Sequence, residues 1–373
     1  MKPPPAPLLG IDASRMAAAR TGIENYLHHL LPGLVAEWRA GGGDAVVFAS
    51  DPAVAAHVAP PVRVVRGGGR GWTQVRLPAA AGREGIGIYF SPIPVLPMLR
   101  VMPCPAVLTV HDLLEFRRRW AYFRRLIGHS LGRASAVICV SQATEAEVLA
   151  EFPFVAGRSV VVREAADPAV FHEVAAAADS PVLARLGISE PPILAVGTIQ
   201  PRKNYERLIE AHARLAAAGP VPPLLIVGGQ GWDYAPVLAA PARVGTEGQV
   251  IFAGHVPEPE LGDLMRASLL LAQVSIGEGF GLPIVEAMHS GLPILASDIP
   301  VFREVAGNAA LFVNPLSAGD IAAGLRRLVD DHRARAELVE VGRGRRGLFS
   351  WERAAREVAV ALRAAAHGTR WPR

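Results

Sequence analysis

Residues 269–296, LLLAQVSIGEGFGLPIVEAMHSGLPILA, contain two apolar runs separated by a glycine-rich loop and a helical pattern. The runs Leu269–Ala272 and Pro293–Ala296 have the length and composition of buried strands. Pro283 suits the first turn of a helix, where its missing N–H is not needed. A strand, a crossover helix and a second strand are the unit of a parallel sheet. This stretch therefore predicts an α/β fold.

The same alternation runs through the rest of the chain. In the first half, strands are expected at Leu8–Ile11, Ala45–Phe48, Val62–Val65, Ile86–Phe90, Ala106–Val110, Ala136–Val140 and Val160–Val162. A second series comprises Ile193–Val196, Leu224–Val227, Val250–Phe252, Leu269–Ala272, Pro293–Ala296 and Ala310–Val313. With 373 residues, 51% of them hydrophobic and 19% charged, the chain is larger than one core usually organises. We expect two α/β domains.

The segment Ala165–Pro191 separates the two series of strands. An Asp-Pro pair, several alanines and a Ser-Pro pair interrupt the pattern there, as in a hinge or linker. We expect an N-terminal domain over residues 1–170 and a C-terminal domain over residues 171–350. A new helix begins near Ser350, with apolar residues at helical spacing. These residues, Trp351, Ala355, Val358 and Leu362, predict that residues 351–373 join the first domain.

Cysteine content and the N-terminal segment bear on the compartment. Cys104 lies between two prolines and Cys139 lies in an apolar run, so neither a disulfide framework nor a zinc cluster is expected. The segment Met1–Pro7 is rich in proline and lacks the apolar core of a secretory signal. No apolar stretch reaches the roughly 20 residues that span a bilayer. We therefore expect a cytoplasmic protein.

Positive charge is concentrated between Arg100 and Arg133. Seven arginines there accompany only Asp112 and Glu115 among acidic residues, with aromatic residues between them. Such a segment, above all Arg117–Arg125, suits an anionic membrane surface or a phosphate-bearing acceptor, and a solvated helix face is the alternative. No nucleic-acid-binding motif accompanies the charge, so a nucleic acid partner is not expected.

Ligands of open parallel sheets bind at the carboxyl ends of the strands, which directs attention to the residues that follow each strand. After the first strand, Thr21-Gly22-Ile23-Glu24 has the spacing of a capping box, and Gly22 leaves room for an anion at its amide. A simple helix cap is the alternative. After Ala106–Val110, His111 and Asp112 place a polar pair at the end of an apolar run. His111 is expected to point into the ligand cleft, or else to bond a loop carbonyl.

The third informative stretch is VGTIQPRKN, residues 196–204, followed by an amphipathic helical pattern over Tyr205–Ala217. Pro201 is expected to fix the start of that helix. Arg202 and Lys203 are adjacent cations beside the positive end of a helix dipole, where they would repel one another unless an anion joined them. We expect a diphosphate as that anion, and surface cations are the alternative.

The loop inside the opening stretch carries two glutamates. Glycines at positions 279 and 281 permit a tight loop with exposed amides, and Glu286 lies about one turn inside the following helix. Glu278 and Glu286 can therefore address two parts of one ligand, while helix entry and packing are the structural alternative. The chain has no Asp-x-Asp pair, no Walker lysine loop and no G-x-S-x-G elbow, so no metal is expected.

The block Glu278–Glu286 is identified as the E-x7-E motif of retaining glycosyltransferases of family 4. The chain resembles the mannosyltransferase-like members of that family over nearly its whole length. Thr21-Gly22, His111-Asp112, Gly197–Asn204 and Phe252–Val256 follow in the order typical of the family.

This resemblance implies a GT-B fold, in which two Rossmann-like domains face each other across a cleft. The first domain would bind the acceptor, the second would bind the nucleotide sugar, and the last helix, Trp351–Ala366, would cross back to the first. The implied donor-binding residues are Gly22, Thr198, Arg202, Lys203, Val256, Glu278, Phe280, Gly281, Leu282 and Glu286. Among them, Gly22, Arg202, Lys203 and the amides of Phe280 to Leu282 would bind the diphosphate. Glu286 would accept the ribose hydroxyls, Glu278 would hold the sugar, and Val256 would flank the base.

The implied catalytic residues are His111, which would contact the transferred sugar, and Arg202, Lys203 and Glu278. Two cations and helix amides can neutralise a departing diphosphate without a metal or other cofactor. The expected reaction is retaining transfer of a hexose, most readily mannose from GDP-mannose, to a glycan or lipid-linked acceptor in cell-surface polysaccharide or glycolipid synthesis. Ser275-Ile276-Gly277 departs from the family pattern of proline, serine and an aromatic residue, which bears on sugar specificity.

Two alternatives share this fold. A sugar-nucleotide epimerase would change the donor sugar and need no acceptor. A catalytically silent binding relative would have lost Lys203, Glu278 or Glu286, yet all three are present.

Overall fold

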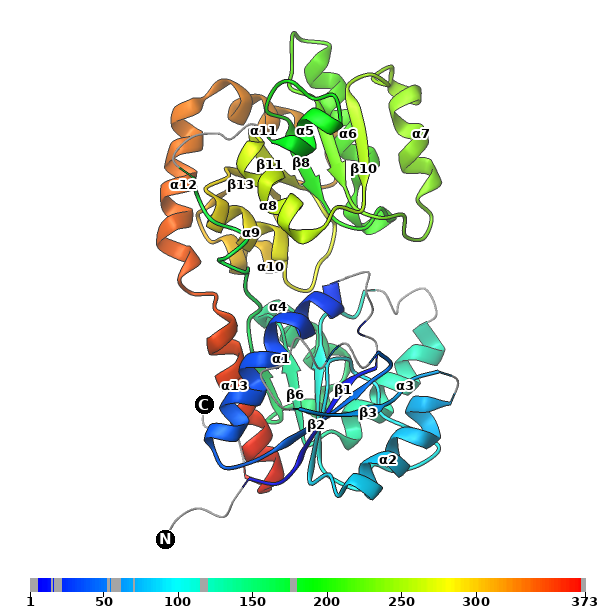
Figure 1. The fold of residues 1–373 in the computed structure, drawn as a ribbon. Coiled ribbons are helices and arrows are strands. Elements are labelled where there is room, and N and C mark those ends of the chain that lie inside the picture. The colour runs from blue at the N-terminus through cyan, green and yellow to red at the C-terminus, as the bar shows by residue number, and fades with distance from the viewer. Residues whose placement is uncertain are drawn as a thin grey trace. The chain divides into compact units, whose positions relative to one another are not determined.

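The computed structural model describes residues 6–14, 16, 22–51, 54, 62–69, 71–114, 120–174 and 180–369. The chain divides into two compact units. Unit 1 comprises Met1–Glu164 and Ser350–Arg373, and unit 2 comprises Ala165–Phe349. The division after Glu164 lies a little before the boundary expected at residue 170. Each unit contains one sheet with helices on its faces (Figure 1).

Among the described residues, the sheet of unit 1 has seven strands, all parallel, in the order β3-β2-β1-β4-β5-β6-β7. The strands are β1 Leu9–Ala13, β2 Ala45–Ala49, β3 Arg63–Arg66, β4 Ile88–Ser91, β5 Ala106–Val110, β6 Ala136–Cys139 and β7 Ser159–Val161. All seven overlap predicted strands, with ends that differ by at most two residues. The chain moves outward from β1 to β3 and then returns to the other side of β1 with β4. This reversal creates a switch point between β1 and β4.

Helices of unit 1 connect these strands. They are α1 Gly22–Ala40, α2 Leu77–Glu84, α3 Trp120–Arg133 and α4 Gln142–Glu151. One face of α1 is a buried apolar stripe that includes Leu27, Leu30 and Leu34, the spacing of a helix packed on a sheet. The start of α4 is capped by Ser141, whose hydroxyl oxygen accepts a hydrogen bond of 3.0 Å from the amide of Thr144.

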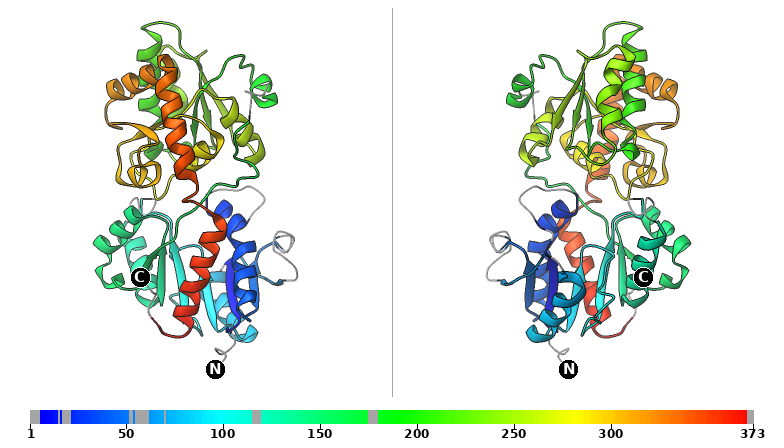
Figure 2. Two further views of the ribbon diagram at one scale, coloured as in Figure 1. Left: turned by 90° about the vertical axis from the view of Figure 1, so that its left-hand side faces the viewer. Right: turned by 90° about the vertical axis from the view of Figure 1, so that its right-hand side faces the viewer.

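The last helix, α13 (Trp351–Ala366), packs against α1 and against β4, β5 and β6 of unit 1. Figure 2 shows it beside α1. A β-carbon added to Gly33 of α1 would lie 3.0 Å from that of Ala355, so the two helices approach closely at a small residue. The predicted return of this helix to the first domain is confirmed. Its buried stripe, which includes Val358 and Leu362, supplies the apolar surface for this packing.

In the described part of unit 2 the sheet has six strands, all parallel, in the order β10-β9-β8-β11-β12-β13. They are β8 Ile193–Val196, β9 Leu224–Val227, β10 Val250–Gly254, β11 Leu270–Gln273, β12 Ile294–Ser297 and β13 Ala310–Val313. These strands also overlap the predicted ones, with ends that differ by at most two residues. The chain again runs outward on one side, from β8 to β10, before β11 continues on the other. The switch point of this unit lies between β8 and β11.

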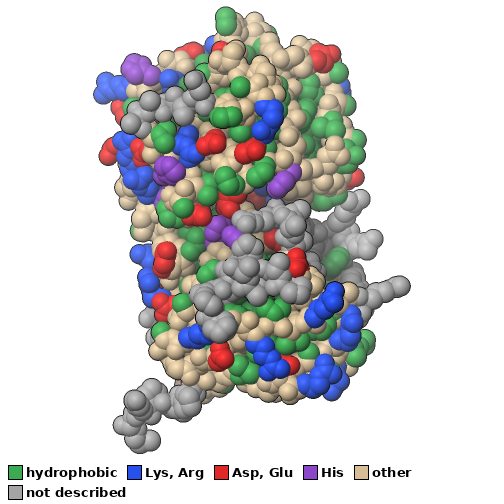
Figure 3. All heavy atoms as spheres, in the orientation of Figure 1, with side chains coloured by type: hydrophobic (Ala, Val, Ile, Leu, Met, Phe, Trp, Pro, Cys, Tyr) green, Lys and Arg blue, Asp and Glu red, His purple; other side chains and the backbone are tan. Residues whose placement is uncertain are grey.

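The helices of unit 2 are α5 Pro181–Arg185, α6 Tyr205–Ala216, α7 Ala235–Val244, α8 Glu258–Ala267, α9 Leu282–Ser290, α10 Pro300–Ala306, α11 Ala318–Asp330 and α12 His332–Arg346. A core of fully buried side chains joins α6 and α11 to the sheet, with Leu208, Ile226 and Leu325 among its members. On the face shown in Figure 3, charged side chains of both signs lie among apolar ones. Within the described ranges, no helix is both long and apolar enough to cross a membrane.

Candidate functional site

The loops that follow β8 and β11 lie side by side at the switch point of unit 2. After β8 the chain forms a short 3-10 helix, Pro201–Lys203, before α6 begins. Pro201 therefore opens this turn and not α6, which corrects the sequence interpretation. The amide of Ile276, in the loop after β11, donates a hydrogen bond of 2.9 Å to the carbonyl oxygen of Arg202. The two loops are joined through their backbones as well as their side chains.

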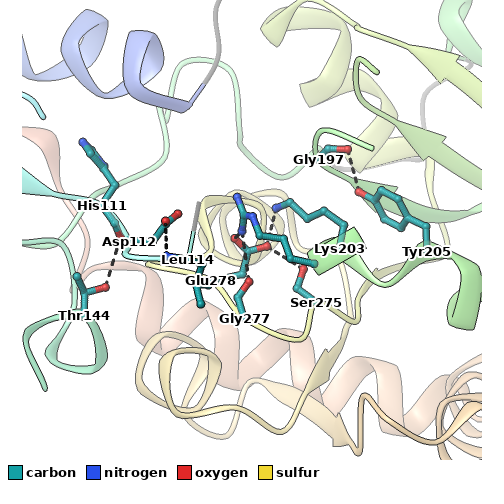
Figure 4. Close-up of polar contacts among 11 residues, drawn as sticks. His111, Asp112, Leu114, Thr144, Gly197, Lys203, Tyr205, Ser275, Gly277 and Glu278 are labelled. Atoms are coloured by element: carbon teal, nitrogen blue, oxygen red, sulfur yellow. Dashed lines mark hydrogen bonds and ion pairs between the residues drawn. The ribbon is translucent and has the colours of Figure 1, made fainter. Parts of the chain in front are cut away.

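A cluster of charged side chains lies where these loops meet (Figure 4). The Glu278 carboxylate accepts from Lys203, with 2.5 Å between Nζ and Oε1, and from the Ser275 hydroxyl at 2.8 Å. Its second oxygen, Oε2, pairs with Nη1 of Arg202. The side chains of Lys203 and Glu278 are only 9% and 8% exposed. The structure thus brings together three of the predicted site residues, which we call the Glu278 cluster, with Ser275 as a further member.

The charge of the Glu278 cluster follows from its surroundings. Burial alone would raise the pKa of Glu278, but the cations of Lys203 and Arg202 and the hydrogen bond from Ser275 bring that pKa down to about 2. Arg202 and Lys203 both pair with this one ionised carboxylate. The sequence led us to expect a ligand diphosphate between the cations, whereas here a protein carboxylate lies between them. Such a cluster is suited to bind an anion that can displace or share this carboxylate.

Gly197 makes the position of Lys203 possible. Its φ of 142° lies in the region that favours glycine, and an added β-carbon would lie 2.8 Å from Cε and 2.9 Å from Nζ of Lys203. The Tyr205 hydroxyl donates a hydrogen bond of 3.0 Å to the carbonyl oxygen of Gly197. Burial and the nearby Glu278 carboxylate raise the pKa of Tyr205, so the phenol stays protonated and remains a donor. The lysine therefore lies against a fixed backbone with no side chain in its path.

Asn204 ties the loop after β8 to its neighbours. It adopts a left-handed conformation with φ of 62°, which asparagine tolerates better than most residues. Its side-chain amide donates to the carbonyl oxygens of Val274 at 2.9 Å and Pro315 at 2.7 Å. No role was expected for Asn204 from the sequence. Its position between a cationic turn and a helix could have indicated a structural role, because asparagine accepts the positive φ found at such a junction.

The start of α9 has the geometry that the glycine pattern predicts. Gly281 precedes the helix with φ of 105°, and Leu282 and Pro283 form its first turn. An added β-carbon on Gly281 would lie 2.8 Å from the ring of Phe302, so packing as well as backbone conformation requires glycine. Glu286 is buried one turn inside α9, as predicted.

The other predicted donor residues of unit 2 lie at the same edge of the sheet. Thr198 is exposed in the loop after β8, and Val256 is buried just beyond the end of β10. Phe280 is buried with its ring in an edge contact with Phe349, with 5.9 Å between centroids. Because parallel strands end at one edge, these residues and the Glu278 cluster share that edge.

His111 of unit 1 follows β5 and contacts two oxygen atoms. Its Nδ1 lies 2.9 Å from Oε1 of Glu164, and its Nε2 lies 3.0 Å from the carbonyl oxygen of Pro92. A hydrogen bond to a loop carbonyl was one of the two expectations for His111, and the Pro92 carbonyl provides it. The contact with the Glu164 carboxylate was not predicted. Glu164 follows the strand predicted at Val160–Val162, so examining the residues after every strand would have revealed it. The neighbouring Asp112 accepts a hydrogen bond from the amide of Leu114.

Other predicted residues of unit 1 are described only in part. Gly22 is exposed and is the first residue of α1, whereas Thr21 lies outside the described residues. The first three residues of Arg117–Arg125 also lie outside them. Within that segment, Arg124 forms an ion pair with Glu151. Across the described part of the chain, no group of three or more histidine, cysteine, aspartate or glutamate side chains is placed to hold a metal ion.

Two parallel α/β units of this kind define the GT-B class of glycosyltransferase folds. The structure of Anabaena Alr3699/HepE in complex with UDP-glucose superimposes with a TM-score of 0.76 at 19% identity, covering 95% of this chain and 98% of that one. At this identity the similarity establishes the fold alone.

Sequence comparison identifies the family. Residues 20–170 match the family described as Glycosyltransferase Family 4, and residues 185–345 match Glycosyl transferases group 1. The O-antigen chain mannosyltransferase B of Escherichia coli is 30% identical over 256 residues, which cover 66% of this chain and 67% of that protein. The O-antigen chain mannosyltransferase RfbU of Salmonella typhimurium is 30% identical over 226 residues, 59% of this chain and 58% of that protein. The chain belongs to the family 4 glycosyltransferases and is a hexosyltransferase.

Proposed function

We propose that this enzyme transfers mannose from GDP-mannose to a glycan or lipid-linked acceptor, with retention of the anomeric configuration. The product would belong to a cell-surface polysaccharide or glycolipid. Family membership supports hexosyl transfer, and two relatives are named as O-antigen chain mannosyltransferases. The observation that carries the proposal is the Glu278 cluster at the carboxyl edge of β8 and β11, where Arg202 and Lys203 both pair with the Glu278 carboxylate.

The chemistry of the leaving group explains this arrangement. As the bond between the sugar and the diphosphate breaks, negative charge develops on the diphosphate, and preorganised cations stabilise it without further rearrangement. Two cations side by side on one carboxylate suit an anion with two negative charges, such as a diphosphate. On binding, the diphosphate would take over contacts of Arg202 and Lys203. The oxygens of Glu278 would then be released to accept hydroxyls of the sugar.

The remaining donor contacts are proposed from the family resemblance and the placement of each residue. The first amides of α9 point along the axis of a helix dipole that favours phosphate, which supports a role for Phe280, Gly281 and Leu282. Glu286 would accept the ribose hydroxyls. Further contacts with the donor are assigned to Gly22, Thr198, Val256 and His111, with Val256 beside the base and His111 at the transferred sugar.

The proposed reaction needs neither a metal ion nor a dedicated carboxylate base. Two cations neutralise the leaving group. In a retaining transfer the diphosphate leaves and the acceptor hydroxyl attacks on the same face of the sugar. A phosphate oxygen of the departing nucleotide can therefore take the proton of the acceptor hydroxyl. We further propose that the enzyme works in the cytoplasm. Its basic segment Arg117–Arg125 would hold it at the anionic inner membrane surface, where a lipid-linked acceptor lies.

The donor is tested first by thermal shift against GDP, UDP, ADP and dTDP with their sugars. A ligand that binds only the folded chain stabilises it by about 2.7 kcal/mol at one hundred times its Kd. GDP and GDP-mannose should raise Tm, and Lys203→Ala should abolish the rise. A response to UDP compounds alone would overturn the choice of GDP-mannose.

The reaction is tested by incubating GDP-mannose with candidate acceptors and determining the new anomeric configuration by NMR. Retention in the glycoside product is expected. An inverted product would contradict the proposed mechanism. Conversion of the donor into a different sugar nucleotide without any acceptor would instead identify an epimerase.

A further inference from the structure

We infer that Glu164 is a positioning residue, which holds His111 as a hydrogen-bond donor toward the substrate. This inference rests on the proposed function, because it assigns the partner and the chemical role of a residue in that site. The ligand group that His111 would meet is an acceptor oxygen, such as a sugar hydroxyl oxygen.

The two residues meet at one edge of the sheet of unit 1. His111 directly follows β5, and Glu164 comes shortly after the end of β7. Both strands are parallel, and only β6 lies between them, so their carboxyl ends are close. The Glu164 side chain is 6% exposed and that of His111 is 19% exposed. Glu164 is thus a buried carboxylate whose oxygen lies 2.9 Å from Nδ1 of His111.

The two partners of the His111 ring are both acceptors. A carboxylate oxygen of Glu164 faces Nδ1, and the carbonyl oxygen of Pro92 faces Nε2 at 3.0 Å. A neutral imidazole carries only one N–H, so it can satisfy only one of these oxygens. With Glu164 as a carboxylate, which only accepts, both hydrogen bonds form when each ring nitrogen carries a hydrogen. In this arrangement His111 donates from both nitrogens and has no lone pair to act as a general base.

The two hydrogen bonds differ in strength. The bond to Glu164 joins a cation to an anion, whereas the bond to Pro92 ends on a neutral carbonyl, and charge-assisted bonds are roughly twice as strong. A substrate oxygen can therefore replace the Pro92 carbonyl at Nε2 while Glu164 keeps its bond at Nδ1. Glu164 thereby determines that Nε2 of His111 faces the substrate and that this nitrogen carries a hydrogen.

Aromatic packing holds the ring in the same orientation. Tyr26 of α1 meets His111 edge to face, with centroids 4.8 Å apart and planes at 85°. The Tyr26 hydroxyl lies 3.4 Å from Oγ1 of Thr109, and its ring also contacts Trp351 of α13 at 5.9 Å. Burial raises the pKa of Tyr26, with the Glu164 carboxylate adding to the rise, so the phenol stays neutral. The histidine therefore has little freedom except to exchange its partner at Nε2.

A double-mutant cycle separates positioning from general stability. Glu164→Ala should lower kcat about tenfold or more while the Kd for GDP stays unchanged, and Glu164→Gln should lose less because its amide oxygen still accepts from Nδ1. His111→Ala alone should lower kcat by about a hundredfold or more. In the His111→Ala background, Glu164→Ala should have no further effect, because the two substitutions remove one shared interaction. Glu84→Gln is the matched control, since Glu84 is also a largely buried carboxylate of unit 1 that pairs with a cation, Arg63.

Each alternative outcome has a distinct meaning. Wild-type kcat in Glu164→Ala would overturn the inference, and so would an equal loss of kcat in both backgrounds, which indicates a purely structural role. A His111→Ala variant with wild-type kcat would overturn it too, because Glu164 is proposed to act only through His111.

A spectroscopic measurement tests the geometry independently of activity. In protein labelled with ¹⁵N-histidine, the Nδ1 and Nε2 signals of His111 should both show attached hydrogens, and the Nδ1 proton should be lost or shifted in Glu164→Ala. An unprotonated Nδ1 in the wild type would overturn the inference. If the wild type transferred no sugar from any donor tested, the proposed function would fail, while this signal would still decide whether Glu164 orients the ring.

Discussion

Lys203 and Glu278 lie 75 residues apart in the sequence, yet Nζ of the lysine is 2.5 Å from Oε1 of the glutamate. Both side chains are buried, and removing one partner of a buried ion pair is destabilising. Arg202 adds a second cation to the same carboxylate. The pair therefore holds a lysine ammonium in place in the absence of any ligand. A diphosphate that replaces the carboxylate finds its cation already positioned.

Gly197→Ala should disturb this preorganisation. The new methyl group would lie 2.8 Å from Cε of Lys203, and the φ of 142° is unfavourable for alanine. The ammonium must then move, and loss of one charge-assisted hydrogen bond costs roughly 1.5–3 kcal/mol, so the donor KM should rise at least about tenfold. Steady-state kinetics measure this rise. Gly248→Ala, where nothing lies within 4 Å of the new methyl group, is the control. Equal KM values in the two variants would show that Lys203 tolerates the methyl group.

Acid should destabilise the wild type more than Glu278→Gln. The pKa of Glu278 is lowered from 4.5 to about 2, so its contribution to stability is present above pH 4.5 and is lost as the pH falls toward 2. Compared with Glu278→Gln, the wild type should lose about 1 kcal/mol more unfolding free energy by pH 3.5 and about 3 kcal/mol more by pH 2. Urea unfolding at several pH values measures it. Glu210→Gln removes an exposed i,i+4 partner of Arg214 and should keep the wild-type slope. If the unfolding free energy of all three proteins fell equally with pH, the proposed contribution of Glu278 to stability would be refuted.

Lys203→Ala and Glu286→Ala should differ in kinetics. Glu286 is expected to bind the nucleotide equally in the ground state and the transition state, so its loss should mainly raise the donor KM. Lys203 gains strength as charge develops on the diphosphate, so its loss should also lower kcat. Each effect should be about ten- to two-hundred-fold. Glu337→Ala, on the exposed surface of α12, serves as control. Unchanged donor affinity in Glu286→Ala would remove that residue from the proposed site.

Sugar transfer should continue in the presence of EDTA, because Arg202 and Lys203 supply the positive charge that a metal would otherwise provide. The measurement is the transfer rate before and after chelation, followed by addition of magnesium or manganese. Complete loss of activity that only added metal restores would contradict the proposal.

The basic segment should bind anionic membranes. Replacing the arginines of Arg117–Arg125 by glutamine should abolish salt-sensitive sedimentation with liposomes that contain phosphatidylserine, since each basic residue near such a surface contributes about 1 kcal/mol. The Kd for GDP should not change. Arg333→Gln, which removes an exposed arginine of α12, is the control. If the glutamine variant still bound the liposomes like the wild type, the segment would be an ordinary solvated surface.

The strands and the main helices were determined by the sequence itself. Buried parallel strands are continuous apolar runs, so Ile193–Val196 and Leu224–Val227 are recognisable without any knowledge of their neighbours. The helix Trp351–Ala366 could also be predicted from local sequence, since its apolar stripe and the cap at Ser350 lie within a few turns of each other. The position of Glu286 one turn inside α9 follows from the proline and glycines before it.

The contacts between residues distant in the sequence were decided by the tertiary structure. Nothing near Glu278 in the sequence indicates that its carboxylate lies between Lys203 and Arg202, and nothing near His111 indicates Glu164. Each contact exists because the strand order brings the carboxyl ends of particular strands together, β8 beside β11 in one unit and β5 near β7 in the other. Strand order depends on packing over the whole sheet, whereas sequence patterns report only the burial of each element. For this reason the sequence could indicate which polar residues follow each strand, but not how they pair.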